Sequence, residues 1–266
     1  MKKFILMTML AGFAAMLSGC LEPTSRSMGA TLMPSPIMHK LTPDTTTSNI
    51  SIGATGFGGF TDNEYNVRNL TAFGGSLDFT YHISGSNPFF INVAVGGLGG
   101  SLKFSCDTEN NSNCTAFLHD SYAQWLVSDE GQKSYSFWNT QERILAGFDF
   151  SADYIIIGLA GGFQFFQGAS KYDDMRKKLN DDHIAHDIDG KRDYGVVMAY
   201  WLGFYMGNHG KYGNLVAELD ILHKDGLDNW TASNKLTYTH TTGFFAGIAS
   251  NSLIAWTVYA GKRFDF

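Results

Sequence analysis

Long apolar runs, proline and positive charge are all scarce in this sequence of 266 residues. The longest apolar stretch, over residues 4–17, has about 14 residues, short of the roughly 20 that a helix needs to cross a bilayer, so no membrane-spanning helix is predicted. Lys and Arg number 19 against 25 Asp and Glu, and this net charge of −6 argues against a nucleic-acid partner. With five prolines, 30 glycines and 14% aromatic residues, the chain is expected to be rich in turns and strands and poor in helices.

The first 19 residues are expected to be a secretory signal peptide. Lys2 and Lys3 precede the apolar stretch, and a Leu-Ser-Gly-Cys run over residues 17–20 follows it. A charged start, a short apolar core and a small-residue end are typical of an export signal. Removal of this segment takes away two positive charges, so the mature chain of about 247 residues carries a net charge of −8.

The four residues that end at Cys20 resemble the lipobox of bacterial lipoproteins. The resemblance implies that Cys20 becomes the new N-terminus and carries acyl chains such as palmitate. Each buried methylene contributes about 0.8 kcal/mol, so we expect this lipid to hold the protein on a membrane. Leu21 is similar to the residues that let lipoproteins move on to the outer membrane, which is the predicted location. An ordinary signal peptide with a chance cysteine is the alternative.

Residues 20–48 are predicted to form a lipidated, extended tether ahead of the folded domain. They hold four of the five prolines and a Thr/Ser run, a composition typical of linkers. The remaining residues, 49–266, are enough for one β domain of ordinary size.

Two cysteines other than Cys20 lie close together in a polar segment. Seven residues separate Cys106 from Cys114, and an exported protein meets an oxidising environment. A disulfide between them is therefore expected. Two free thiols or half of a metal site are the alternatives, but the spacing fits no zinc motif and no further Cys or His cluster lies nearby.

Apolar and polar residues alternate from residue 49 onward in blocks of roughly 12 to 16, the pattern of strands with two different faces. In one block Leu77 and Phe79 fall on one face, while Asp78 and Thr80 fall on the other. Strands of soluble sandwiches average about five or six residues, whereas membrane strands need about 9 to 11. The sequence therefore predicts an all-β fold, an antiparallel up-and-down transmembrane β-barrel.

The strand pattern recurs in an odd number of segments. Single-chain bacterial barrels have even strand counts, so we expect eight to ten strands. Either one strand has been split in two, one lies in the tether, or one segment folds outside the barrel. Short turns alternate with long polar loops at 106–135 and 171–192, and each long loop is expected to hold a short helix. The segments are approximately 49–60, 69–84, 89–105, 136–150, 154–168, 194–207, 213–223, 235–249 and 252–266.

The last eight residues resemble the terminal-strand signal that the outer-membrane barrel-assembly machinery reads. The positions that carry the resemblance are Tyr259, Gly261, Phe264 and Phe266. The resemblance implies insertion into the outer membrane, with outer-membrane lipid and the assembly machinery as partners. A lipid-tethered soluble barrel or sandwich is the alternative.

Charged side chains on the polar face of the strands are predicted to point into the lumen. An eight-stranded barrel has an interior just wide enough to be filled by side chains, so these charges are expected to pair as a network that plugs it. A selectivity lining for a narrow pore is the alternative. The predicted lumen residues are Asp78, His82, Arg143, Asp149, Glu218, Asp220, Arg263 and Asp265.

Three motifs are candidates for reactive or binding sites. The alternation places His240 on the lipid-facing side, where a membrane esterase could hold its base, but Ser250 and Ser252 lie well along the strand from it, so no catalytic residue is predicted. His183 and His186 could bind a metal, yet a solvated acidic loop is preferred and no metal is assigned. The glycine-rich run at 96–100 lies in a strand pattern with no following helix, so no nucleotide site or cofactor is expected.

These observations favour a non-enzymatic outer-membrane barrel lipoprotein whose surface loops make contacts or protect the cell envelope. No nucleic-acid partner is expected, and the sequence leaves any surface partner open. A narrow solute channel, a lipid-modifying hydrolase and a soluble, lipid-tethered ligand-binding barrel are the alternatives.

Overall fold

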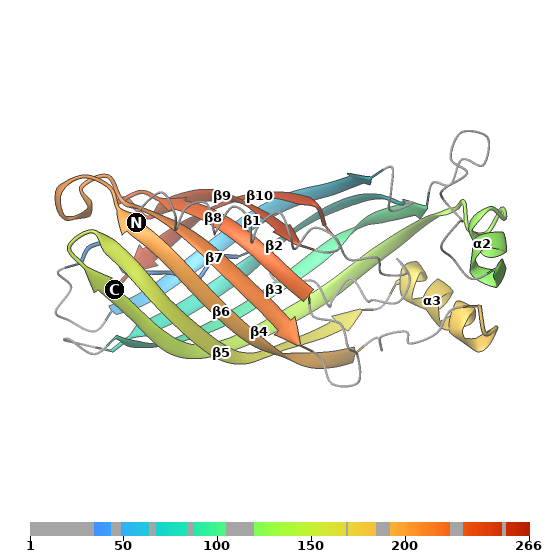
Figure 1. Cartoon of the computed structure of the whole chain (residues 1–266), viewed down its shortest axis with the longest axis horizontal. Helices are drawn as coiled ribbons and strands as arrows, with labels where there is room; N and C mark the ends of the chain where they lie inside the picture. Colours follow the sequence, from blue (N-terminus) through green and yellow to red (C-terminus); the bar gives the residue numbers. More distant parts are fainter. Residues whose placement is uncertain are drawn as a thin grey trace.

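The computed structural model describes residues 35–43, 49–63, 68–83, 88–104, 120–168, 170–184, 192–223, 231–251 and 254–266. Within these residues, ten antiparallel strands form a closed barrel (Figure 1). The strands are β1 (Asn49–Asn63), β2 (Arg68–His82), β3 (Phe89–Phe104), β4 (Ser134–Ala152), β5 (Ile155–Gly168), β6 (Arg192–Tyr205), β7 (Asn214–His223), β8 (Thr231–Thr239), β9 (Phe244–Asn251) and β10 (Trp256–Asp265).

Each strand pairs with its neighbours in sequence, and the barrel closes where β10 pairs with β1. The register of this seam runs from Ser51 opposite Asp265 to Phe60 opposite Trp256. Closure leaves no open sheet edge, so the backbone groups along each strand find partners within the wall. The expected all-β, up-and-down barrel of eight to ten strands is confirmed.

The odd number of segments in the sequence has a cause that none of the three expected explanations covered. The segment predicted as a single strand over 235–249 contains most of β8 and β9, which a tight turn separates. His240 Nδ1 lies 2.8 Å from Thr242 Oγ1, and Gly243 has a φ of +84°. That backbone conformation favours glycine and reverses the chain between the two strands.

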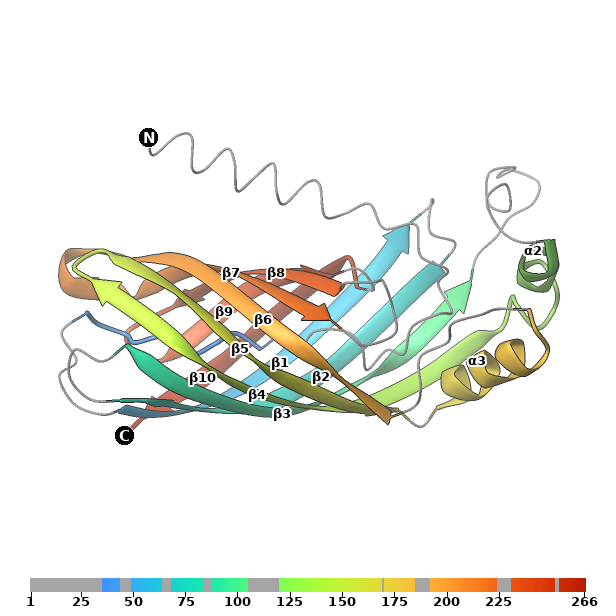
Figure 2. The same ribbon diagram turned by 60° about the horizontal axis from the view of Figure 1, so that its bottom comes forward.

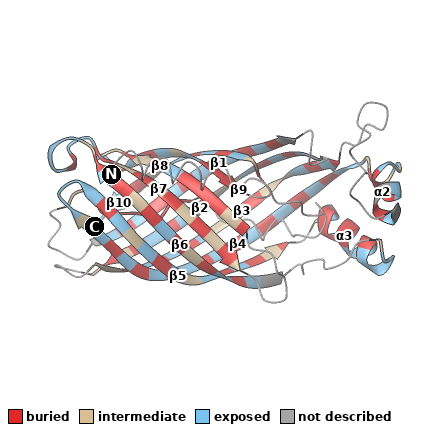
Figure 3. Ribbon diagram, viewed as in Figure 1, coloured by how far each residue is buried: buried red, intermediate tan, exposed pale blue. Residues whose placement is uncertain are grey.

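Exposed and buried residues alternate along the strands (Figure 3). The exposed residues are largely apolar, whereas the interior holds polar and charged side chains together with two apolar clusters. Phe73 and Leu77 of β2 are 65% and 59% exposed, whereas the adjacent Ser76 and Asp78 are buried. An apolar exterior of this extent is unfavourable in water and favourable in hydrocarbon. The arrangement is that of a barrel that spans a membrane. Among the described residues, no helix is both long enough and apolar enough to cross a membrane.

The two ends of the barrel differ. At the terminal rim, β1 begins at Asn49 and β10 ends at Asp265, and the connections at 153–154, 206–213 and 240–243 are short. The opposite, long-loop rim carries α2 (Asp120–Leu126) and α3 (Lys171–Asp181), which lie together beyond the strand ends (Figure 2). Both helices fall in the long loops where the sequence predicted them.

Candidate functional site

The predicted lumen residues lie on the inner face of the wall, and all except Asp265 are buried there. Asp265 lies at the terminal rim, where its Oδ1 is 2.6 Å from Arg263 Nε. Arg263 in turn donates from Nη2 to Ser51 Oγ at 2.9 Å. The strict alternation of inward and outward residues along each strand accounts for this placement.

One cluster of the lumen pairs two cations with three carboxylates. Lys235 Nζ lies 2.7 Å from Glu218 Oε1 and 2.6 Å from Asp220 Oδ2. Arg143 Nη1 lies 3.5 Å from Asp220 Oδ2, and its Nη2 lies 3.9 Å from Asp78 Oδ1. Charges buried in this way are stable only as a paired set, because each alone would bear the cost of its desolvation.

The sequence reasoning did not identify Lys235 as a lumen residue. The signal was present, because Lys235 shares its face with Ser233 and Thr237, and β8 sets it directly opposite Glu218 on β7. Finding it required the correct boundary of β8 and its register against β7.

A second cluster surrounds the carboxylate of Asp149. His82 Nε2 and His39 Nδ1 lie 3.3 Å and 3.4 Å from Asp149 Oδ2, and Trp201 Nε1 donates to Oδ1 at 3.0 Å. The rings of His39 and Trp201 are 5.0 Å apart. His82, Asp149 and Trp201 belong to the wall, whereas His39 does not.

His39 belongs to residues 35–40, a stretch without helix or strand that lies inside the barrel and is called the lumen segment below. All six of its residues are buried. The sequence placed residues 20–48 outside the barrel as an extended tether. The described part of that stretch does lack regular structure, but residues 35–40 pack inside the domain that was expected to begin at residue 49.

The inner end of the lumen segment is held at the cluster of buried ion pairs. Arg143 Nη2 and Lys235 Nζ both donate to the main-chain oxygen of Ser35, at 3.4 Å and 3.1 Å. The main-chain nitrogen of Ile37 donates to Glu218 Oε2 at 3.1 Å. Side chains that pair with one another thus also bind the backbone of the segment.

The outer end of the lumen segment is held near the terminal rim. Arg263 Nη1 donates to the main-chain oxygen of His39. Tyr205 OH and Asn214 Nδ2 donate to the main-chain oxygen of Lys40, at 3.2 Å and 3.1 Å. Tyr205 ends β6 and Asn214 begins β7, so the segment runs from the interior toward this rim.

Glycines make room for this stretch of chain. A Cβ atom on Gly53 of β1 would lie 2.7 Å from Met38 Cε, closer than such contacts normally occur. At the terminal rim Gly210, with a φ of +76°, would place a Cβ 3.1 Å from the main-chain oxygen of Leu41. The wall is therefore shaped to accommodate the chain.

Barrel size explains why side chains alone do not fill the lumen. The interior grows with strand number, and eight strands are about the size that side chains can fill. Ten strands enclose a wider space. The lumen segment occupies part of this space, which the expectation of a plug made of side chains alone did not foresee.

The chain is similar in fold to several solved membrane barrels, all at low identity. No family model matches the sequence, and no curated protein was found to be similar to it. OprG from Pseudomonas aeruginosa is 8% identical with a TM-score of 0.39, and the match covers 85% of this chain and 99% of OprG. Ail of Yersinia pestis, in complex with the heparin analogue sucrose octasulfate, is 13% identical with a TM-score of 0.34, covering 82% of this chain and 97% of Ail. An outer membrane channel from Pseudomonas putida F1 is 8% identical with a TM-score of 0.41, covering 87% of this chain and the whole of that one.

The residues that resemble the assembly signal lie on both faces of β10. Tyr259 is buried in the lumen, with its OH 2.6 Å from Thr237 Oγ1. Gly261 also faces inward, where a Cβ would meet the ring of Phe245 and the main-chain oxygen of Ala54. Phe264 and Phe266 are exposed on the outside.

Several other residues singled out in the sequence lie apart from the lumen or outside the described residues. His240 was expected on the lipid-facing side of a strand but lies in the turn between β8 and β9. Among the described residues no group of side chains could hold a metal ion, although His186 falls outside them. Cys20, Cys106 and Cys114 also fall outside the described residues.

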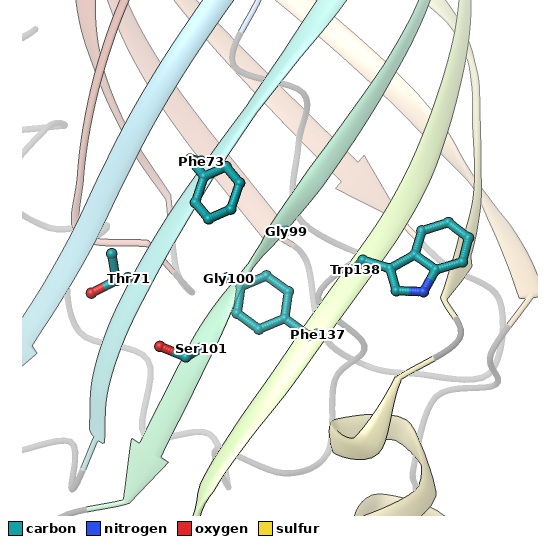
Figure 4. Close-up of a pocket in the computed structure, with 7 residues that line it drawn as sticks. All are labelled: Thr71, Phe73, Gly99, Gly100, Ser101, Phe137 and Trp138. Atoms are coloured by element: carbon teal, nitrogen blue, oxygen red, sulfur yellow. The ribbon is translucent and has the colours of Figure 1, made fainter.

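The glycine-rich run of β3 borders a groove on the outer surface near the long-loop rim (Figure 4). Its volume is about 520 Å³, and Gly99 lies directly between Phe73 on β2 and Trp138 on β4. Thr71, Gly100, Ser101 and Phe137 complete the lining. The groove opens on the apolar exterior. A Cβ on Gly100 would meet the main-chain oxygen of Thr71, so this glycine allows β2 and β3 to pack closely.

The long-loop rim has an ordered structure of its own. Trp125 of α2 packs against Phe104 of β3 with ring centroids 5.4 Å apart, and it stacks on Tyr122 at 5.6 Å. In the turn that follows α2, Lys133 Nζ lies 2.6 Å from Glu130 Oε2. This hydrogen bond and charge lower the pKa of Glu130 below its ordinary value. The helix is thus fixed against the end of the wall.

Proposed function

We propose that this protein is an outer-membrane β-barrel lipoprotein without catalytic activity, closed by its own lumen segment and acting through its long-loop rim. The observation that carries the proposal is the burial of residues 35–40 inside a wall that is apolar outside. A lumen that holds its own chain segment is suited to a display scaffold, because the segment and the ion pairs around it obstruct the path of solutes. The partners in this proposal are outer-membrane lipid, the barrel-assembly machinery and a surface partner of unknown identity.

The closed state is tested by the conductance of the purified full-length protein in planar bilayers. We expect no channel steps, together with faster migration of the unheated protein than of the boiled protein on a denaturing gel, the usual behaviour of intact membrane barrels. Steady conductance would contradict the closed lumen. Identical migration of the two samples would contradict the membrane barrel itself.

The packing of α2 against the wall supports a contact role for the long-loop rim. An epitope inserted after Asp129, in the turn that follows α2, is expected to bind antibody on intact cells. The matched epitope between Asn208 and His209, at the terminal rim, is expected to bind only after the outer membrane is permeabilised. The opposite pattern would place the long-loop rim in the periplasm and remove the proposed contact surface.

Lipid anchoring at Cys20 is part of the same proposal. Labelling cells with an alkyne analogue of palmitate is expected to mark the protein, and the Cys20→Ser variant is expected to lose the label. A label that persists in Cys20→Ser would contradict acylation at this residue.

Absence of catalysis is tested separately from the barrel. Purified protein is expected to release no fatty acid from phospholipid vesicles. If hydrolysis is found, a His240→Ala variant with undiminished activity would remove His240 as its base, and any activity intrinsic to the chain would contradict the non-enzymatic proposal.

A further inference from the structure

Most of the hydrogen bonds between the wall and its resident segment run to main-chain atoms of the segment, and the His39 side chain adds a contact to Asp149. The contacts to Ser35, His39 and Lys40 described above are hydrogen bonds to carbonyl oxygens, and the contact to Ile37 is a hydrogen bond from its N–H. Each non-proline residue of any polypeptide offers the same donor and acceptor. These hydrogen bonds therefore depend on the path of the backbone more than on the side chains that it carries.

The donors of the wall are held in place by partners that are also in the wall. Glu218 and Asp220 position Lys235, and Asp265 positions Arg263. Groups that are already oriented lose little freedom when they bind a ligand. The wall is thus preorganised for a backbone ligand whether or not residues 35–40 occupy it.

The closure of the barrel does not involve the lumen segment. The ten strands pair with one another around the full ring, and residues 35–40 add no strand to it. If the lumen segment left the barrel, its hydrogen bonds to side chains of the wall would break. The main-chain hydrogen bonds between the strands would stay intact. A closed wall that carries the buried ion pairs on its inner face would remain.

We propose that the lumen is a binding channel for an extended polypeptide, and that residues 35–40 are an occupant which a second unstructured polypeptide segment can replace. This inference rests on the proposed membrane barrel. Six extended residues span at most roughly 20 Å, which sets the length of the bound stretch. Because Asp149 faces His39 at 3.4 Å, a neutral or basic residue is preferred at that position.

The resident segment can be driven out by one substitution that leaves the wall intact. His39→Asp places a carboxylate beside Asp149, and two carboxylates at that separation repel each other. We expect this variant to fold as a heat-modifiable barrel and to conduct ions where the parent is silent. His209→Asp, the same change in the connection at the terminal rim, is the matched control and is expected to stay silent.

Synthetic peptides then test what the opened lumen binds. The end-blocked hexapeptide Ser-Pro-Ile-Met-His-Lys is expected to block the His39→Asp channel, and a hexapeptide of scrambled order is expected to block within about fivefold of the same concentration. A peptide N-methylated at Ile loses the donor to Glu218. A hydrogen bond to a charged group contributes about 1.5–3 kcal/mol, so at least a tenfold higher concentration should be needed for block.

Each outcome separates the inference from the proposed function. A silent parent whose opened variant is blocked by none of the peptides would overturn the inference and leave the closed barrel standing. Block by the native order alone, unaffected by N-methylation, would also overturn it, because recognition would then run through side chains. A conducting parent would refute the proposed closure first. If His39→Asp does not fold, Gly53→Val displaces the segment through Met38 instead, and the same peptides and the same criteria apply.

Discussion

The positive charge of Lys235 holds together the cluster of buried ion pairs in the lumen. Its ammonium group lies within 2.7 Å of two carboxylates and also binds the main chain of Ser35. Lys235→Met leaves Glu218 and Asp220 with less positive charge in a buried site. Breaking a buried ion pair costs about 3–5 kcal/mol, and we expect a loss of that order in the free energy of unfolding, measured with urea in lipid vesicles.

Lys262 is the matched control for this substitution. It lies on the outer face at the terminal rim, with Nζ 4.1 Å from the ring centroid of Phe244. Lys262→Met should change the free energy of unfolding by about 1 kcal/mol or less. Equal effects of the two substitutions would show that the buried cluster is not a stabilising network.

Gly53 tests the fit between the wall and the lumen segment. Gly53→Val adds bulk at the position of Met38 Cε, so the Met38 side chain has to move. We expect peroxide to oxidise Met38 several-fold faster in this variant, as measured by peptide mass spectrometry. Gly56→Val, on the outer face of the same strand where a Cβ meets nothing within 4 Å, should leave the oxidation rate unchanged. A similar rate in both variants would mean that the segment does not depend on the space at Gly53.

At the scale of single residues, the sequence reveals which face a side chain occupies but not what it touches. Asp78 and Arg143 could be placed in the lumen because alternation fixes inward and outward positions within one strand. Their partners depend on cross-strand register and on barrel size, which a single strand pattern does not contain. Lys235 was missed for this reason, and His39 was missed because it lies on no strand.

At the scale of elements, the hairpin of β8 and β9 shows how a strand pattern can hide a turn. The turn at 240–243 is His-Thr-Thr-Gly, and its four residues keep the outward positions even-numbered on both sides, with Leu236 exposed on β8 and Phe244 on β9. The alternation of inward and outward residues therefore keeps its phase across the turn. For this reason the segment was predicted as one strand. Only Gly243, with its φ of +84°, carried a turn signal.

This turn should be sensitive to substitution of its glycine. At Gly243 an added Cβ would meet the main-chain oxygen of Arg263, and the positive φ strains any other residue. We expect Gly243→Ala to lower the free energy of unfolding by about 1–3 kcal/mol, a cost typical of such strain. Gly56→Ala supplies the control, and a neutral Gly243→Ala would show that the turn relaxes without cost.

The lumen segment is an element that composition alone could not place. Its single proline, Pro36, and the Thr/Ser run that follows it are typical of a linker, and it forms neither helix nor strand. Its burial follows from donors and acceptors scattered over β4, β6, β7, β8 and β10, none of which is close to it in sequence. Local pattern therefore predicts its irregular backbone but not its position inside the barrel.

At the scale of the whole molecule, the apolar exterior predicts that the cost of an outward-facing charge depends on its depth in the membrane. Leu77, exposed near the middle of β2, should tolerate charge poorly, and Leu77→Arg is expected to cost about 2–4 kcal/mol. Thr71→Arg, on the same face nearer the long-loop rim, should cost about 0–1 kcal/mol. Unfolding in vesicles measures both, and equal, small effects would indicate that this face meets water.

The overall architecture was the most predictable property of the chain. Long alternating blocks determined the class of fold, because two-faced strands of this length suit a membrane wall. The content of the interior was less predictable, since it depends on the exact strand number that sets the width of the barrel.

The seam between β1 and β10 joins the first strand of the wall to the last. A ribosome completes residue 40 long before it reaches Trp256. Residues 35–40 are therefore synthesised before the seam between β1 and β10 can form. Either the strands close around the lumen segment, or the segment enters the barrel through its rim after the seam has formed. The order of these two events sets the folding pathway, and a pulse-chase comparison of Met38 protection with seam formation would distinguish them.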